Sequence, residues 1–249
     1  MPAPATLLVT GDLHLGRFPS YVPASDTSLS VEAVWEAVVT LAIEQEVDAV
    51  VLTGDVADQD NKLFEAIEPV RRGVERLGKA GIQTIAVSGN HDFDVLHRLG
   101  ALLDDEGFTL LGAGGKWEAL TLRRSGEPLL QFVGWSFPSR YARDSPIHSF
   151  SAPESEVPTL GLVHGDLGAL TSPYAPLDRA ALAALPVKAW LLGHIHRPAF
   201  DRTGSTVTLY PGSPQPLDPG EAGVHGPWLV TVTADGHIEA EQHALATVR

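Results

Sequence analysis

Five short apolar segments of this chain each end in polar residues of the kinds that bind metal ions. Their side chains are carboxylates, one amide and imidazoles, and the 249-residue chain has no cysteine that would add a thiolate. Oxygen and imidazole ligands suit Mn²⁺, Fe²⁺, Zn²⁺ or Co²⁺ rather than soft ions, and we expect Mn²⁺ first among them. The candidate metal ligands are Asp12, His14, Asp55, Asn90, His164, His194 and His196.

Seven protein ligands are too many for one ion and suit two, with Asp55 as the bridging carboxylate. Two divalent ions about 3.5–4 Å apart are an arrangement used for phosphoryl chemistry. Each ion polarises a phosphate oxygen, and a bridging water that loses its proton at neutral pH becomes the nucleophile. The ligand set therefore predicts hydrolysis of a phosphate ester.

Two further residues complete the predicted chemistry. His91 follows the ligand Asn90 and is free to protonate the leaving alkoxide. Asp92 is expected to hold that imidazole in orientation. The predicted catalytic pair is therefore His91 and Asp92.

The first half of the chain alternates strand and helix patterns, which predicts parallel pairing with right-handed crossovers. Pro69 is expected to kink or split the second helix. The expected strands cover 5–12, 48–55 and 82–92, and the expected helices cover 28–46 and 61–81.

The second half reads as successive strands with one short helix at 178–185 and a long surface loop at 140–158. Strands with similar endings lie on both sides of this loop, so we expect one domain over 1–249 rather than two. The expected strands lie within 115–122, 129–137, 159–166, 189–196, 205–213 and 227–245.

The carboxyl ends of strands in an α/β sheet form one rim, so the five polar groups are expected to converge there. Side chains two apart in an extended segment point the same way. On this argument His194 and His196 reach one site together, as do Asp12 and His14.

Composition and charge limit the classes of protein and the cellular compartments in which such a site is expected. The chain carries 17 basic and 31 acidic residues, a net charge of −14, which opposes binding to nucleic acid through phosphate neutralisation alone. It has no apolar stretch of transmembrane length and no signal-peptide pattern at its start. Together with the absence of cysteine, this predicts a cytoplasmic protein.

The ordered set of motifs resembles that of the calcineurin-like metallophosphoesterases over nearly the whole chain. The resemblance implies a four-layer α/β/β/α sandwich with two mixed sheets and a dinuclear centre between them, and it makes His91 the general acid. One ion would be held by Asp12, His14, Asp55 and His196, and the other by Asp55, Asn90, His164 and His194.

Further stretches, at 12–17, 54–60, 191–199 and 210–221, are similar to the SbcD-type DNA-repair exonucleases. Those nucleases carry a capping domain after the Gly-Ser-Pro segment, and this chain ends soon after it. We therefore expect no cap and no docking segment for an SMC-like ATPase. Asp58 also stands where archaeal and eukaryotic relatives have a histidine that helps place DNA.

Three functions remain open at this point. The first is a DNA-repair-type nuclease that works by attack of metal-bound hydroxide, and the second is a small-molecule or nucleotide phosphoesterase on the same site. The third is a binding subunit without activity, against which the full ligand set and His91 argue. A homodimer through the helix at about 61–80 is expected from the same relatives. Phosphate or rim contacts are expected from Arg17, Arg140, Arg197 and His225.

Overall fold

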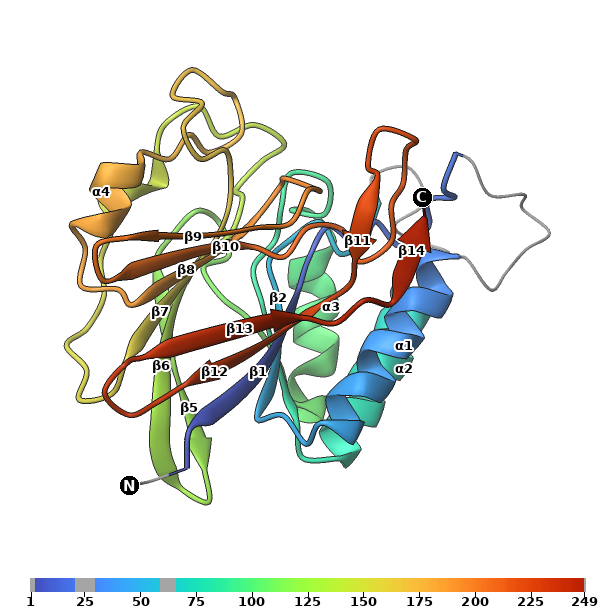
Figure 1. Cartoon of the computed structure of the whole chain (residues 1–249), viewed down its shortest axis with the longest axis horizontal. Coiled ribbons are helices and arrows are strands. Elements are labelled where there is room, and N and C mark those ends of the chain that lie inside the picture. The colour runs from blue at the N-terminus through green and yellow to red at the C-terminus, as the bar shows by residue number, and fades with distance from the viewer. Residues whose placement is uncertain (1–2, 21–29, 59–65, 249) are drawn as a thin grey trace.

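Two six-stranded mixed sheets pack face to face in the computed structural model, which describes residues 3–20, 30–58 and 66–248. The longer helices lie together on the outer side of one sheet, and loops with a short helix lie outside the other (Figure 1). The order of the layers is α/β/β/α, as predicted from the sequence. The fourth layer is mostly loop, since its one α-helix, α4, covers only Arg179–Ala183.

The first sheet has the order β13-β12-β1-β2-β3-β4. Its four consecutive strands from β1 to β4 run parallel, and β12 and β13 add an antiparallel edge. Its strands are β1 (Ala5–Thr10), β2 (Ala49–Leu52), β3 (Gln83–Ala86), β4 (Phe108–Leu110), β12 (Trp228–Val232) and β13 (Ile238–Gln242).

The second sheet has the order β5-β6-β7-β8-β10-β9, with four parallel strands inside and an antiparallel strand at each edge. Its strands are β5 (Glu118–Arg124), β6 (Glu127–Trp135), β7 (Thr159–His164), β8 (Ala189–Gly193), β9 (Ala199–Thr203) and β10 (Thr206–Tyr210). A separate pair joins β11 (Gly223–His225) to β14 (Ala246–Val248).

Helices α1 (Val31–Glu44), α2 (Ile67–Lys79) and α3 (Leu96–Leu103) cover the first sheet. Ser30 caps α1 by accepting the backbone N–H of Ala33 at 3.1 Å. Trp35 is fully buried between α1 and α2, and its indole N–H donates to the Pro69 carbonyl at 2.9 Å. In the described ranges, no helix combines the length and the apolar character that a membrane span requires.

The expectation that Pro69 interrupts the second helix is wrong. Helix α2 begins at Ile67, so Pro69 lies in the first turn, where its missing N–H would have no intrahelical partner in any case. Residues 61–65 of the expected helix lie outside the described residues. The homodimer expected at this helix stays a prediction.

Several elements escaped the sequence analysis: α3, β4, β9, β11 and β14. The helical pattern of α3 is only eight residues long and contains Gly100 in its interior. The expected long loop at 140–158 is confirmed, because it forms only the 3₁₀ turn Pro146–Ser149 and one isolated bridge at Ala142. Every expected strand that carries a motif is also shorter than expected, so most of the polar motif residues follow the strands.

One apolar layer fills the space between the two sheets. Residues of β1, β2 and β3 that point away from the helices meet residues of β6, β7, β8 and β10 there. The buried contributors include Leu7, Val9, Val51, Ile85, Phe132, Leu162, Leu191 and Leu209. This contact fixes the two sheets relative to each other, so that loops following strands of both sheets lie close together.

Candidate metal centre

The predicted ligands meet where the loops after β1, β2 and β3 face the ends of β7 and β8. Potential ligand atoms lie within 4.8 Å of one another in three groups that share members. Asn90 joins them through its side-chain oxygen, 3.2 Å from His164 Nε2. The groups are Asp12, His14 and His196; His14, Asp55 and His91; and Asp55, His164 and His194.

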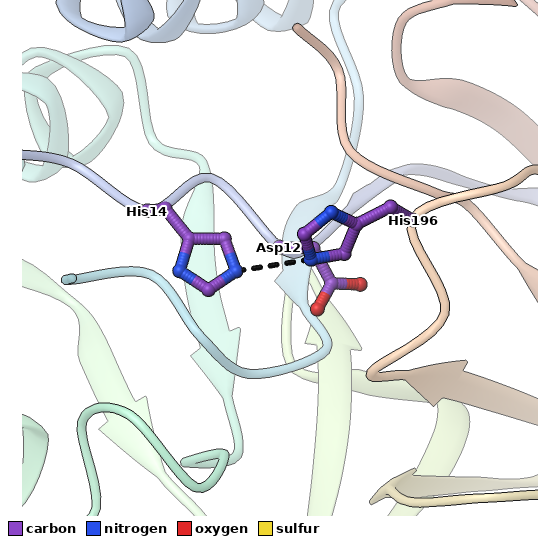
Figure 2. A group of neighbouring side chains, drawn as sticks. All are labelled: Asp12, His14 and His196. Atoms are coloured by element: carbon purple, nitrogen blue, oxygen red, sulfur yellow. Dashed lines mark hydrogen bonds between the residues drawn. The ribbon is translucent and has the colours of Figure 1, made fainter. Parts of the chain in front are cut away.

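Figure 2 shows the first group, in which the side chains of Asp12, His14 and His196 point toward one another. The Nε2 atoms of His14 and His196 are 3.1 Å apart, although the two residues are 182 positions apart in the chain. Asp12 also accepts the backbone N–H of His194, at 3.1 and 3.2 Å to its two oxygens. Two sheets therefore contribute to one set of ligands.

The backbone around the ligands is not extended, which corrects one step of the sequence argument. Asp12, His14 and Asp55 each have φ of +49°, and His194 has φ of +94°. Non-glycine residues rarely adopt this left-handed region, and such strain concentrates at functional sites. His194 and His196 accordingly enter different ligand groups rather than pointing the same way.

The hydrogen bonds of His164 show that its site fits a cation. Its Nδ1 lies 3.1 Å from the Thr53 carbonyl, which can only accept, so Nδ1 carries the hydrogen. Nε2 then faces only acceptors, Asn90 Oδ1 and, at 3.3 Å, the Asp55 carboxylate, so a proton or a metal ion is needed between them. Burial lowers the pKa of His164, but Asp55 and Asp12 outweigh it and raise the pKa to about 9. A positive charge is therefore favoured at this position.

Glu221 orients the ring of His196, as the Thr53 carbonyl orients the ring of His164. The sequence analysis did not identify Glu221 as a functional residue. Its Oε1 accepts from His196 Nδ1 at 2.7 Å, which leaves the Nε2 lone pair facing the ligand group. Its Oε2 accepts from the Leu217 backbone N–H at 2.8 Å and the Ser213 hydroxyl at 3.3 Å. Carboxylates that hold a metal-binding imidazole in this way are typical of metal sites. In the sequence, Glu221 was only part of the family-like stretch 210–221.

Asp55 lies between the two halves of the site. It belongs to the ligand groups of both His14 and His164, and its other oxygen accepts the backbone N–H of His91 at 2.9 Å. Burial alone would raise the pKa of Asp55, but His164, His14 and His91 outweigh it and lower the pKa. The carboxylate is therefore ionised and placed as a bridging ligand would be.

The expected contact between Asp92 and the His91 ring is wrong. The buried Asp92 carboxylate accepts the backbone N–H groups of Gly89 and Val56 at 2.8 and 2.7 Å, and so ties the loop after β3 to the loop after β2. The carboxylate facing His91 Nδ1, at 3.7 Å, is that of Asp58. Asp58 also lies 3.4 Å from His14 Nδ1.

The residues predicted to contact phosphate or to line the rim of the site differ in burial and in their partners. His225 is buried, with its ring nitrogens 2.7 and 2.8 Å from the carbonyls of Ser213 and Glu221, so the expectation that it lines the rim is wrong. Arg17 forms an ion pair with Asp218 at 2.8 Å. Arg197 is exposed beside His196.

Two glycines in the motifs allow the ligand-bearing loops to approach one another this closely. A Cβ on Gly89 would lie 2.1 Å from Asp55 Oδ1. On Gly193 it would lie 2.0 Å from the Thr53 carbonyl oxygen and 2.5 Å from His164 Nδ1. These glycines are therefore required by packing between ligand-bearing loops.

Gly193→Ala is expected to lower the free energy of unfolding by about 1–3 kcal/mol, because a methyl group has no room between Thr53 and His164. Chemical denaturation followed by circular dichroism measures the change. Gly220→Ala is the control, since nothing lies within 4 Å of its added Cβ. Equal stabilities of the two variants would contradict the packing role.

Glu221→Gln is expected to weaken metal binding about 10- to 100-fold, because the imidazole of His196 loses a charged partner that orients it. Titration of the metal-depleted protein with Mn²⁺, followed by calorimetry, measures the affinity. Glu239→Gln on β13 provides a control with an exposed carboxylate. Unchanged affinity in Glu221→Gln would show that His196 needs no such support.

Comparison with known proteins agrees with this site. Residues 5–198 match the family described as calcineurin-like phosphoesterase. The chain is 24% identical to the uncharacterized metallophosphoesterase YhaO of Bacillus subtilis, over 95% of this chain and 59% of that protein. It is 28% identical to the DNA double-strand break repair protein Mre11 of Halobacterium salinarum, over 93% of this chain and 57% of that protein. The chain thus spans less than three fifths of either relative.

Solved structures share the fold at low identity. A dimetal phosphatase from Danio rerio superposes with a TM-score of 0.59 and 12% identity, covering 98% of this chain and 100% of that chain. The TT1561 protein of Thermus thermophilus has a TM-score of 0.53 and 15% identity, with coverages of 96% and 99%. With the sequence match over residues 5–198, these findings show that the chain belongs to the calcineurin-like phosphoesterase family of hydrolases.

Proposed function

We propose that this protein is a two-metal phosphodiesterase of the DNA-repair nuclease type. The observation that carries the proposal is the pair of ligand groups joined by the ionised Asp55, with His91 at their accessible side. The His91 side chain is 31% exposed, whereas those of Asp55 and His164 are almost fully buried. A phosphodiester can therefore reach His91, while Asp55 and His164 stay shielded from bulk water.

The residues divide naturally between two ions. Asp12, His14 and His196 would hold one, Asn90, His164 and His194 the other, and Asp55 both. Divalent ions bound there would supply Lewis-acid activation of the phosphate and of the attacking water. Glu221 and the Thr53 carbonyl fix the rings of His196 and His164, so that their Nε2 lone pairs face inward.

His91 would act as the general acid. One of its nitrogens faces the Asp58 carboxylate, which stabilises a protonated ring and restrains its orientation. Burial lowers the pKa of His91, and the Asp55 and Asp58 carboxylates oppose that effect. The net effect is a lowered pKa of His91, which makes the protonated ring a stronger acid and favours donation to a leaving alkoxide.

Similarity to the Mre11 repair proteins supports DNA as the substrate class. The charge of −14 argues for a substrate bound locally at the site rather than through a broad basic face. We also propose that residues 1–249 form one domain, because β12 and β13 from the end of the chain pair with β1 and complete the first sheet.

A time course on end-labelled single- and double-stranded DNA with Mn²⁺ tests the proposal, with His91→Ala protein beside the wild type. Degradation by the wild type and little by the variant is the expected result. A bis-aryl phosphodiester serves as the substrate control. If the protein hydrolyses this small ester and leaves the DNA undegraded, the nuclease assignment is overturned and a small-molecule phosphodiesterase is favoured.

A further inference from the structure

A row of neighbouring aromatic rings extends from the predicted metal centre to the protein surface. The ring centroid of Tyr174 lies 4.8 Å from that of the predicted ligand His194. Tyr141 comes next, with its centroid 5.7 Å from that of Tyr174, and it is 46% exposed. Both tyrosines belong to loops of the second sheet, after β6 and after β7. The outer ring therefore offers an aromatic surface that is linked to a predicted metal ligand through a single intervening ring.

The two loops hold each other in place. The backbone N–H of Ala142 donates to the Pro173 carbonyl at 2.9 Å, and that of Ala175 donates to the Ala142 carbonyl at 2.7 Å. Within the second loop, the Asp166 N–H donates to the Tyr174 carbonyl at 3.1 Å. These bonds fix both tyrosines before any ligand arrives, which lowers the entropic cost of binding.

Two arginines lie over the outer ring in cation–π contact. The guanidinium carbons of Arg140 and Arg143 lie 5.7 and 5.9 Å from the centroid of Tyr141. Neither forms an ion pair within the described part of the chain, although the protein carries far more acidic than basic residues. Carboxylates pair with Arg17, Arg71, Arg72, Arg76, Arg124 and Arg179, whereas Arg98, Arg123, Arg197 and Arg202 resemble Arg140 and Arg143 in forming no ion pair among the described residues.

We propose that Tyr141, Tyr174, Arg140 and Arg143 form a binding site for an unpaired nucleotide of a single-stranded nucleic acid. A base takes the place of a guanidinium over the exposed Tyr141 ring, and the two flexible arginine side chains contact neighbouring phosphates. Only an unpaired base offers its face to a side chain in this way. The site would hold a strand whose adjacent phosphodiester lies at the metal centre, so the inference rests on the proposed function.

The test measures binding of a fluorescein-labelled oligothymidylate by anisotropy in Mn²⁺, with every variant made in the His91→Ala protein and strand integrity checked by gel. Tyr141→Ala is expected to raise the Kd at least fivefold, and Tyr141→Phe to restore it, because the stacking ring is kept. Replacing both Arg140 and Arg143 by alanine is expected to flatten the dependence of log Kd on log salt concentration. The slope should fall by about 0.7 for each phosphate that an arginine neutralises in the parent protein.

The matched control is Arg179→Ala, an exposed arginine of α4 that pairs with Asp201. The Tyr141→Ala variant of the otherwise native protein is expected to hydrolyse a bis-aryl phosphodiester as fast as the wild type. That ester is too small to reach from the metal centre to Tyr141. Equal oligonucleotide binding by Tyr141→Ala and its parent, or no measurable binding by the parent, overturns the proposal.

The two proposals fail separately. Weakened oligonucleotide binding by Tyr141→Ala, in a protein that hydrolyses neither DNA nor the aryl ester, would reject the proposed function and retain the nucleotide site. DNA degradation by the wild type, with undiminished oligonucleotide binding by Tyr141→Ala, would retain the proposed function and reject the nucleotide site.

Discussion

Asp55→Asn is expected to lose both metal ions together and, with them, hydrolysis of every phosphoester. Asp55 contributes an atom to the ligand groups of both His14 and His164, and its ionised carboxylate lies among three imidazoles. Replacing a group that orients a ligand costs about 10- to 100-fold in metal affinity, and removing the shared ligand itself is expected to exceed about 100-fold for each ion. Metal content by inductively coupled plasma mass spectrometry, after dialysis against Mn²⁺, measures the loss.

The amide is the suitable replacement because its oxygen still accepts the backbone N–H of His91, so the loop is preserved. Circular dichroism should show an unchanged fold in the metal-depleted state. Asp201→Asn, an exposed residue of β9, is the control and should keep both ions. An Asp55→Asn protein that retains two tightly bound ions would reject the bridging role.

His91→Ala is expected to keep its metal content and to lose about 10²- to 10⁴-fold in kcat on substrates whose leaving group is an alkoxide. The imidazole is not needed to hold a metal ion, since each side of Asp55 has other ligands. An activated aryl leaving group departs without a proton, so bis-aryl phosphodiester hydrolysis should fall much less. Steady-state kinetics on both substrates measure the difference.

His148→Ala provides the control, because this exposed histidine lies on the 3₁₀ turn Pro146–Ser149. Equal losses on the two substrate types, at unchanged metal content, would mean that His91 positions the phosphate instead of protonating the leaving group. Asp58→Asn adds a second comparison. A smaller loss of the same pattern is expected there at saturating Mn²⁺, because Asp58 faces His91 Nδ1; the ion must be saturating since Asp58 also faces the predicted ligand His14.

Much of the fold was predictable because the chain repeats one local pattern. Short apolar strands ending at Gly-Asp or Gly-Asn, separated by amphipathic helices, predicted β1, β2, β3, α1 and α2. The missed elements are short or lie at edges, as α3, β4 and β9 do. Their stability comes from packing against neighbours, and local sequence carries little of that information.

The roles of the acidic residues around His91 were not predictable. Asp92 adjoins His91 in the chain, and adjacency suggested contact. Its carboxylate instead ties two loops through backbone N–H groups, while Asp58, from another loop, faces the ring. Loop conformation decides this, and left-handed residues such as Asp55 turn side chains in directions that an extended segment would not allow.

The sequence by itself determined the candidate ligands, their types and the order of strands that carry them, because ligand chemistry and strand ends are local properties. The family resemblance already implied how the ligands divide, whereas tertiary structure alone decided that Glu221 contacts His196 and that Tyr174 and Tyr141 lie in a row from His194 toward the surface. These contacts join loops far apart in the chain. Their geometry follows from how the two sheets pack, and no local pattern encodes it.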